Sequence, residues 1–287
     1  MRPESQPWNS VFRPKDFPDA VASIPTMLTR EEQHLLAWLT ENAVSGRGAV
    51  IDLGCFFGGS TARLAYGLKL GKTSAPIYAY DRFEIMEAQK EKLLYQYGVP
   101  KFEGTDMLPL SREALAKIGV PINFCKGDVT QQAWNGADIE ILFVDINKTD
   151  IVNDHVAAEF YGSVVEGGYI VHQDYLHYQT PWLIAQMEIL SECFKFVAAT
   201  HVNTVLFQCI KRPTKDDIQA ARTVGMADER MKALVLKAAK RFSMQRHQEL
   251  TLDAWMALEN TPGERIAWRM NLPQRDARRY EQLLGNM

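Results

Sequence analysis

Three acids that each end an apolar, strand-like run are the first candidates for chemistry in this sequence. Asp81 ends "IYAYD", Asp145 ends "IEILFVD" and Asp174 ends "YIVHQD". The carboxyl ends of parallel strands face a common crevice, where carboxylates accept hydrogen bonds from a ligand or bind a cation. We therefore expect these three acids to border one ligand site.

Two histidines flank the last of these acids in "HQDYLH". His177 lies past the strand end on a loop, and an imidazole with a pKa of about 6.5 is suited to accept a proton near neutral pH. Asp174 would orient its ring and stabilise the imidazolium. His172 points to the face opposite Gln173 and packs against a helix if Gln173 lines the crevice. The predicted catalytic residues are His177, Asp174 and His172.

Aromatic residues close to these histidines allow two interpretations. Tyr175, Tyr178 and Trp182 either stack on a sugar or aromatic acceptor or pack in the core. The sequence does not decide between the two.

The stretch "AVIDLGCFFGGSTARLAYG" starts as a strand, passes through glycines and ends as a helix. Gly54, Gly58 and Gly59 would let the backbone approach a ligand, and the helix from Ser60 or Thr61 would present free N–H groups. Asp81 follows Gly59 by 22 positions and is placed to accept hydrogen bonds from ribose hydroxyls. Asp128 in "CKGDV" lies on the same rim and would accept from an adenine amino group.

The elements that position these residues alternate along the chain. Apolar strands alternating with amphipathic helices predict a doubly wound parallel sheet covered on both faces. Thr29 and Glu32 are predicted to form a capping box at the start of a helix. Gly71 is predicted to be a helix C-cap, and "EGGY" (Glu166–Tyr169) is predicted to form a tight turn. Predicted strands cover 49–54, 77–81, 122–128, 139–145 and 169–174, and predicted helices about 60–69, 84–97, 111–118, 150–165 and 181–193.

The end of the chain departs from this alternation. "FKFVAAT" and "TVLFQCI" are separated by three residues, too few for a helical crossover, so these strands should pair antiparallel. From Pro213 onward the pattern is helical. We predict an irregular arm over 1–28, a ligand-binding α/β domain over 29–211 and a helical extension over 212–287.

Composition limits the classes of protein that fit. The chain has 287 residues, a net charge of −3 and 46% hydrophobic residues, as expected of a globular protein with a proper core. The four cysteines form no C-x-x-C pair and indicate a reducing compartment. Without a signal core or membrane-length apolar run, we expect a cytoplasmic protein that binds neither membranes nor nucleic acid and that forms homo-oligomers, if any, through the C-terminal helices.

Two ligands suit the glycine turn, a dinucleotide and S-adenosylmethionine. "GCFFGGS" lacks the G-x-G-x-x-G spacing suited to a pyrophosphate. Residues 45–211 resemble the class I S-adenosylmethionine-dependent methyltransferases, which implies a mostly parallel seven-stranded Rossmann-like sheet with an antiparallel last strand. The predicted cofactor-binding residues are Asp52, Gly54, Cys55, Phe56, Gly58, Gly59, Ser60, Thr61, Asp81, Arg82, Asp128 and Asp145.

The second half of the site resembles the metal-dependent sugar O-methyltransferases of macrolide and aminocoumarin biosynthesis. By this resemblance, Asp145, Gln173 and Asp174 occupy the positions of the Mg²⁺ ligands. Gln173 replaces a metal-binding acid, and Asn147 replaces the base. Because Mg²⁺ prefers anionic oxygens, we expect weak or absent metal binding.

The predicted reaction is methyl transfer from S-adenosylmethionine to a hydroxyl of a small molecule or glycan. One alternative is an S-adenosylmethionine-binding module with altered catalytic residues, which Gln173 and Asn147 favour. The other is an NAD(P)-dependent oxidoreductase, which the glycine turn and Asp81 favour.

Overall fold

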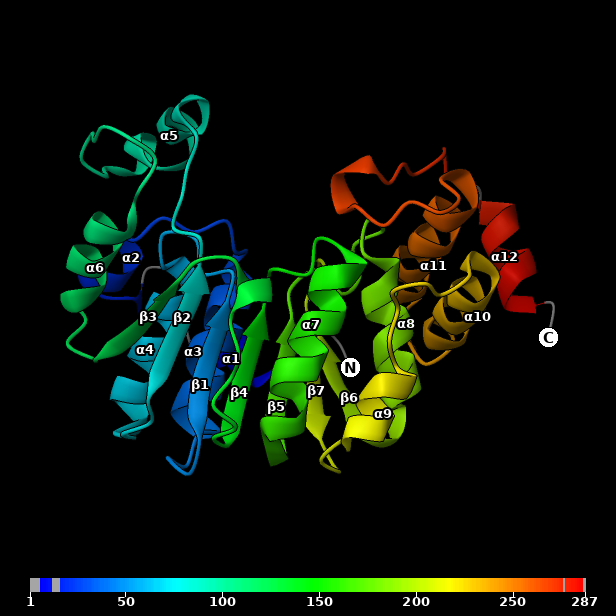
Figure 1. Cartoon of the computed structure of the whole chain (residues 1–287), viewed down its shortest axis with the longest axis horizontal. Coiled ribbons are helices and arrows are strands. Elements are labelled where there is room, and N and C mark those ends of the chain that lie inside the picture. The colour runs from blue at the N-terminus through cyan, green and yellow to red at the C-terminus, as the bar shows by residue number, and fades with distance from the viewer. Residues whose placement is uncertain (1–5, 12–15, 276, 286–287) are drawn as a thin grey trace. The chain divides into compact units, whose positions relative to one another are not determined.

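A seven-stranded sheet organises the chain in the computed structural model, which describes residues 6–11, 16–275 and 277–285. The strand order is β3-β2-β1-β4-β5-β7-β6 (Figure 1). β1 pairs parallel with β2 and β4, β2 pairs parallel with β3, and β6 pairs antiparallel with β7. This confirms the predicted fold class. The strands are β1 (Ala49–Leu53), β2 (Ile77–Asp81), β3 (Ile122–Lys126), β4 (Ile139–Val144), β5 (Val164–His172), β6 (Phe194–Ala199) and β7 (Val205–Cys209).

Contacts between residues divide the chain into two units, which we describe separately. The first contains Met1–Asp145 and Gly167–Ile170, and the second contains Ile146–Glu166 and Val171–Met287. The domain boundaries expected from the sequence stay predictions. Within the expected irregular arm, helices α1 (Pro7–Val11) and α2 (Asp19–Ala22) form, while residues 1–5 and 12–15 lie outside the described residues.

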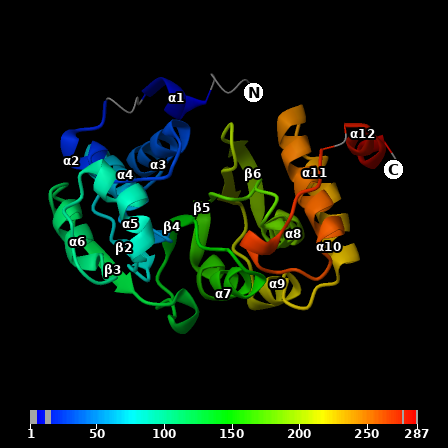
Figure 2. The same ribbon diagram turned by 90° about the horizontal axis from the view of Figure 1, so that it is seen from above.

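The first unit is built around buried parallel strands. Every residue of β1 and β4 is buried, as their continuous apolar sequences require. Helices α3 (Arg30–Asn42) and α4 (Gly59–Gly71) lie together on one face of these strands (Figure 2). They pack closely because Gly67 has no Cβ, which would otherwise lie 2.1 Å from the carbonyl oxygen of Ala37. The capping box of Thr29 and Glu32 at the start of α3 is confirmed.

Gly71 does not cap α4 as predicted. It is the last residue of the helix, and Lys72 takes the left-handed conformation with φ 54°. A Cβ on Gly71 would lie 2.6 Å from the carbonyl oxygen of Glu41, so close packing against α3 explains this glycine. The unit also contains α5 (Glu87–Leu93), which is shorter than predicted, and α6 (Leu108–Ala116), which begins three residues earlier than predicted.

The second unit contains α7 (Asp150–Phe160), α8 (Pro181–Ile189) and α9 (Lys215–Ala220). α7 contacts both α8 and α9, and all three lie on one side of β5 (Figure 2). The predicted turn "EGGY" is wrong, because these residues lie inside β5, which begins at Val164. Gly167 has a φ of +86° within this strand. Glycine can adopt that conformation without ending the strand, and its turn-like composition misled the prediction.

The C-terminal part is helical, as predicted. It contains α10 (Asp228–Ala239), α11 (Gln245–Asn260) and α12 (Ala277–Gly285). α10 packs on α8 and α11, and Ala239, Leu252 and Tyr280 form a small core among the last three helices. No helix within the described ranges combines the length and apolar character needed to cross a bilayer. Short 3-10 turns are η3 (Tyr95–Tyr97), η4 (Val129–Gln131), η5 (Tyr161–Ser163), η6 (Leu190–Glu192) and η7 (Ala267–Arg269).

Candidate cofactor and catalytic sites

The glycine turn after β1 is built partly for internal packing. Gly54 has a φ of +90° and Gly58, the N-cap of α4, a φ of +103°, and both values favour glycine. A Cβ on Gly58 would lie 2.6 Å from Leu115 Cδ1, and one on Gly59 would lie 2.5 Å from the carbonyl oxygen of Pro25. Packing within the protein therefore accounts for Gly58 and Gly59, whereas we had expected both to make room for a ligand.

Asp52 is a buried carboxyl at the end of β1. One of its oxygens, Oδ2, accepts hydrogen bonds from the hydroxyls of Ser60 (2.8 Å) and Thr61 (2.6 Å) at the start of α4. The other, Oδ1, is buried without a hydrogen-bond partner among the described residues. Burial raises the pKa of Asp52 to about 7, although the two hydroxyls oppose this shift. An orphaned carboxyl oxygen of this kind suits a cationic ligand group.

Asp81 connects the loops that follow β1 and β2. Its Oδ2 accepts the N–H of Phe56 (2.9 Å) and its Oδ1 the N–H of Phe83 (2.7 Å). Both phenylalanines have positive φ, 51° and 53°, which is unfavourable for a bulky side chain and needs support from its surroundings. Each carboxylate oxygen retains a lone pair for a ligand hydroxyl. Burial raises the pKa of Asp81, and the backbone bonds from Phe83 and Phe56 oppose it.

The remaining predicted cofactor residues of the first unit lie after β1 to β4. Asp128 follows β3, accepts the N–H (3.0 Å) and the hydroxyl (2.8 Å) of Thr130, and forms an ion pair with the exposed Arg82. Asp145 follows β4, and its N–H donates to the carbonyl oxygen of Leu53 (2.8 Å). Cys55 is a free, buried cysteine, and burial raises the pKa of its thiol. The structure thus places these residues at the carboxyl ends of neighbouring strands, as expected.

In the second unit, Asp174 carries a partner that sequence reasoning missed. Its Oδ2 forms an ion pair with Nζ of Lys148, a residue 26 positions earlier in the loop after β4. The basic residue in "DINK" was the available signal. We expected Asp174 to orient His177, but its carboxylate contacts the lysine instead.

His177 keeps features of a general base. Burial lowers its pKa, Asp174 opposes this shift and Lys148 adds to it, so the ring is neutral at pH 7. Its Nδ1 accepts a long hydrogen bond of 3.4 Å from the N–H of Gln179, which places the ring proton on Nε2. Nδ1 is therefore the basic atom, and it must release this bond to accept a proton. The ring stacks on the half-buried Tyr178.

His172 is fully buried and faces the interior. Its Nε2 is 3.0 Å from the hydroxyl of Tyr161, and burial lowers its pKa to about 3. Tyr175 packs on Phe207 in the same core. From the strand alternation we had expected His172 to pack inward if Gln173 lines the crevice, and the structure shows His172 in the interior. We therefore do not retain His172 as a catalytic candidate.

Asn147 and Trp182 form a buried pair beside this turn. The Nε1–H of Trp182 donates to the carbonyl oxygen of Asn147 (3.1 Å), so Trp182 belongs to the core rather than to an acceptor platform. The amide of Asn147 donates to Oδ1 of Asn153 (2.9 Å), while its own Oδ1 is buried without a partner among the described residues. Asn147 is thus a positioned acceptor but not a base.

The residues expected to hold Mg²⁺ do not fit that ion well. Gln173 brings no negative charge, and Mg²⁺ prefers anionic oxygens. Lys148 already supplies the positive charge next to Asp174 that a metal would supply. In the part of the chain that the structure describes, no three His, Cys, Asp or Glu side chains are grouped to bind a metal ion.

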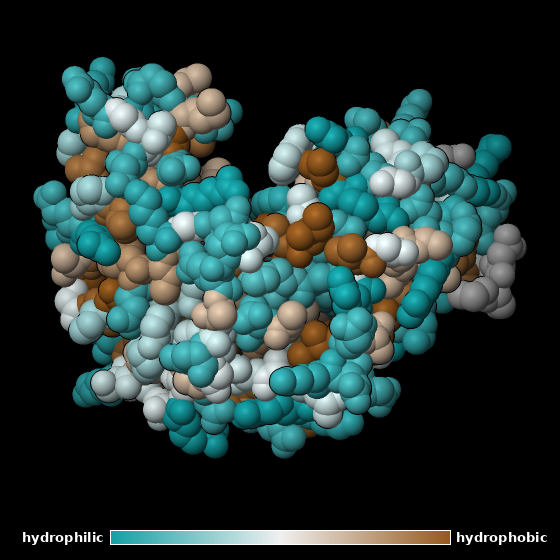
Figure 3. All heavy atoms as spheres, in the orientation of Figure 1, coloured by the Kyte–Doolittle hydropathy of each residue, from teal (hydrophilic) through white to brown (hydrophobic). Residues whose placement is uncertain are grey.

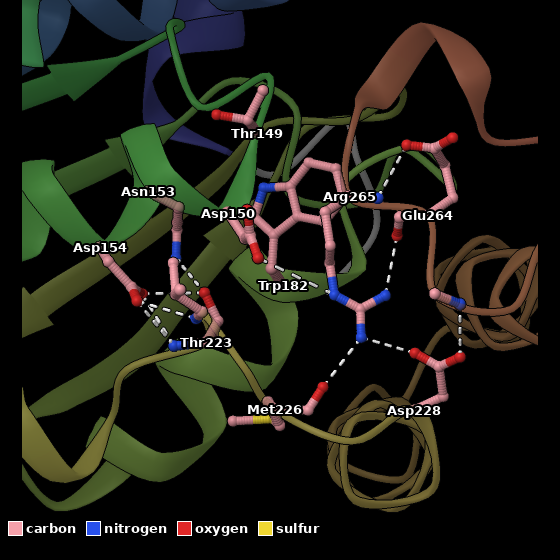
Figure 4. Close-up of polar contacts among 12 residues, drawn as sticks. Thr149, Asp150, Asn153, Asp154, Trp182, Thr223, Met226, Asp228, Glu264 and Arg265 are labelled. Carbon is pink, nitrogen blue, oxygen red and sulfur yellow. Dashed lines mark hydrogen bonds and ion pairs between the residues drawn. The ribbon is translucent and has the colours of Figure 1, made fainter.

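A segment after α11 reaches the loop that carries Lys148. The N–H of Ala267 donates to the carbonyl oxygen of Lys148 (2.9 Å), and Ile266 forms an antiparallel bridge with Thr149. Arg265 fixes this segment through Oδ1 of Asp228 (2.5 Å) and the carbonyl oxygen of Met226 (2.9 Å), with Asp150 at 3.9 Å (Figure 4). The C-terminal extension therefore supports the loop that carries Lys148, the ion-pair partner of Asp174, and the sequence did not reveal this role.

A hydrophobic surface adjoins the same loop. Brown, hydrophobic residues gather around the N-terminal part of α7 (Figure 3), where Ile151 is 62% exposed.

Replacing Arg265 by methionine should destabilise the protein by about 3 kcal/mol, because it leaves the largely buried Asp228 without its cation. The matched control is Arg279→Met, which removes an exposed ion pair with Glu259 and a contact with the Trp255 ring and should cost about 1 kcal/mol. Urea unfolding of both variants measures the difference. Equal stability of the two variants would contradict the anchoring role of Arg265.

Comparison with known proteins defines the class of this fold. No protein-family model and no curated protein matches the sequence. Solved structures do match, and the chain has the fold of the class I S-adenosylmethionine-dependent methyltransferases.

The individual matches are distant in sequence. The O-methyltransferase NovP is 15% identical, with a TM-score of 0.52, and the match covers 69% of this chain and 86% of NovP. CalS11, a TDP-rhamnose 3'-O-methyltransferase of calicheamicin biosynthesis, is 12% identical with a TM-score of 0.48, over 68% of this chain and 89% of CalS11. At 15% identity the similarity to NovP establishes the fold alone.

Proposed function

We propose that this chain binds S-adenosylmethionine in its first unit and transfers the methyl group to a hydroxyl oxygen of a small molecule or glycan. The observation that carries the proposal is the pair of acids at the carboxyl ends of β1 and β2. Asp52 presents an orphaned buried oxygen, and Asp81 presents free lone pairs on a carboxylate held by two backbone N–H groups.

Each acid suits one part of the cofactor. Asp81 would accept hydrogen bonds from the ribose hydroxyls, and Asp128 would accept from the adenine amino group. Asp52 Oδ1 would receive the ammonium group of the methionine part, because a buried carboxyl is best satisfied by a cation. The cofactor supplies the electrophilic methyl group.

On the acceptor side, the protein must remove a proton from the hydroxyl as the methyl group arrives. We assign this role to Nδ1 of His177, which is neutral at pH 7. The Lys148–Asp174 ion pair would set the local charge next to the His177 ring and would bind polar groups of the acceptor.

A thermal-shift panel tests the cofactor and separates the alternatives. S-adenosylhomocysteine at a hundred times its Kd should stabilise the protein by about 2.7 kcal/mol, and NAD and NADP should not. Stabilisation by NAD or NADP alone would favour the oxidoreductase. Stabilisation by S-adenosylhomocysteine without methyl transfer to any acceptor in a panel of sugars and phenols would favour the binding module with altered catalytic residues.

EDTA should leave methyl transfer largely intact. The reason is that Lys148 neutralises Asp174 and that Gln173 brings no negative charge. The measurement is turnover in EDTA followed by added Mg²⁺. If EDTA abolishes turnover and Mg²⁺ restores it, Gln173 coordinates the ion through its amide oxygen and Lys148 moves away.

A further inference from the structure

The second unit contains a cavity that neither the cofactor nor the acceptor needs. It has a volume of about 380 Å³, within the range of small-molecule sites. Neither Asp174 nor His177 lines it. The lining includes residues of α8, β6, β7 and α10, with Phe194 as the first residue of β6 and Ile210 directly after β7.

Aromatic rings dominate the walls of this cavity. Phe207 packs on Tyr175 with ring centroids 5.1 Å apart, and Phe196 packs on Phe242 at 5.2 Å. Three of these rings are nearly buried, whereas Phe196 is 36% exposed. Such edge-to-face walls favour another flat ring.

Two cations, Lys195 and Arg241, and one carboxylate, Glu188, make up the charged side of the cavity. Glu188 is buried, and both its oxygens accept hydrogen bonds from Arg241, at 2.7 and 2.8 Å. Lys237 lies 3.0 Å from the same carboxylate. Lys195, on β6, lines the cavity and is exposed. Arg241 uses two of its five N–H groups on Glu188, and Glu192 also acts on its charge, which leaves three N–H groups for a ligand.

We infer that this cavity is a binding site for a planar aromatic molecule with an anionic group. The ring would lie among the phenylalanines, and the anion would face Lys195 and the remaining N–H groups of Arg241. Tyr175, one residue after Asp174, forms part of the wall and brings the bound molecule next to the candidate catalytic turn.

Calorimetric titration of the full chain with 2-naphthoate tests this inference, with 2-naphthol as the uncharged ring and cyclohexanecarboxylate as the anion without an aromatic ring. 2-Naphthoate should bind more tightly than either. Phe196→Ala and Lys195→Glu should each weaken its binding about tenfold. Both side chains are exposed enough for the variants to fold, which their melting temperatures would verify.

Two controls make the result specific. Lys72→Glu reverses an exposed charge in the first unit and should leave 2-naphthoate binding unchanged. Saturating S-adenosylhomocysteine should not displace 2-naphthoate. The inference is overturned if 2-naphthoate shows no saturable binding, if S-adenosylhomocysteine displaces it, if 2-naphthol binds equally well, or if both cavity variants bind like the wild type. None of these outcomes depends on methyl transfer.

Discussion

Replacing His177 by alanine should lower turnover by about 10²–10⁴-fold and leave the affinity for S-adenosylhomocysteine unchanged. A sugar hydroxyl is a very weak acid, so a base must take its proton during methyl transfer. His177 is neutral at pH 7 and lies next to the Lys148–Asp174 ion pair. Single-turnover methyl transfer and calorimetry with S-adenosylhomocysteine measure the two quantities.

The pH profile gives an independent check on this base. Burial holds the pKa of His177 below its ordinary value of 6.5. Since the neutral ring is the active form, kcat/KM for the acceptor, measured at saturating S-adenosylmethionine, should level off above pH 6.5 and fall as the pH drops through the lowered pKa. His201→Ala removes an exposed histidine as a control. If Lys148→Met abolishes turnover while His177→Ala does not, the ion pair rather than the imidazole carries the chemistry.

Asp81→Ala should weaken S-adenosylhomocysteine binding by about 2–3 kcal/mol, which is roughly a 30–150-fold change in Kd. The variant removes the acceptor for the ribose hydroxyls. It also frees the N–H groups of Phe56 and Phe83, whose left-handed conformations the carboxylate supports. Calorimetry on the folded variant provides the measurement.

Asp106→Ala is the control for this second prediction. Asp106 belongs to the same unit but forms an exposed ion pair with Lys126, and its loss should not change the affinity. Asp81→Asn keeps one acceptor oxygen and should fall between the wild type and alanine. Unchanged affinity in a folded Asp81→Ala protein would refute the assignment of the cofactor site.

The sheet was predictable because its strands are short apolar runs between turn residues. β2 agrees with its predicted span, and the antiparallel pairing of β6 and β7 followed from their three-residue connection. β5 was placed too late, because Gly167 and Gly168 look like a turn in sequence but lie within the strand. The shape of the sheet fixes their conformation there, and local propensity carries no such information.

The candidate site was only partly predictable for a similar reason. Acids at strand ends follow from the order of elements, and the alternation of β5 indicated that His172 packs inward if Gln173 lines the crevice. The pairing of Lys148 with Asp174 spans 26 residues and depends on how two loops meet. Likewise, the segment that Arg265 anchors reaches the Lys148 loop from the C-terminal extension, and no periodicity in the sequence predicts such a contact.

The orphaned oxygen of Asp52 implies that cofactor binding is coupled to the release of a proton from this carboxyl. With a pKa of about 7 instead of 3.8, the Asp52 carboxyl without a bound ligand is about half protonated at neutral pH. The free energy of unfolding therefore decreases as the pH rises from 3.8 to 7, because the folded protein holds this proton and the unfolded chain does not. An ammonium group at Oδ1 favours the ionised form, so binding should release a proton below pH 7 and tighten as the pH rises toward it. Calorimetry in buffers of different ionisation enthalpy would count that proton, and Asp52→Asn should abolish its release.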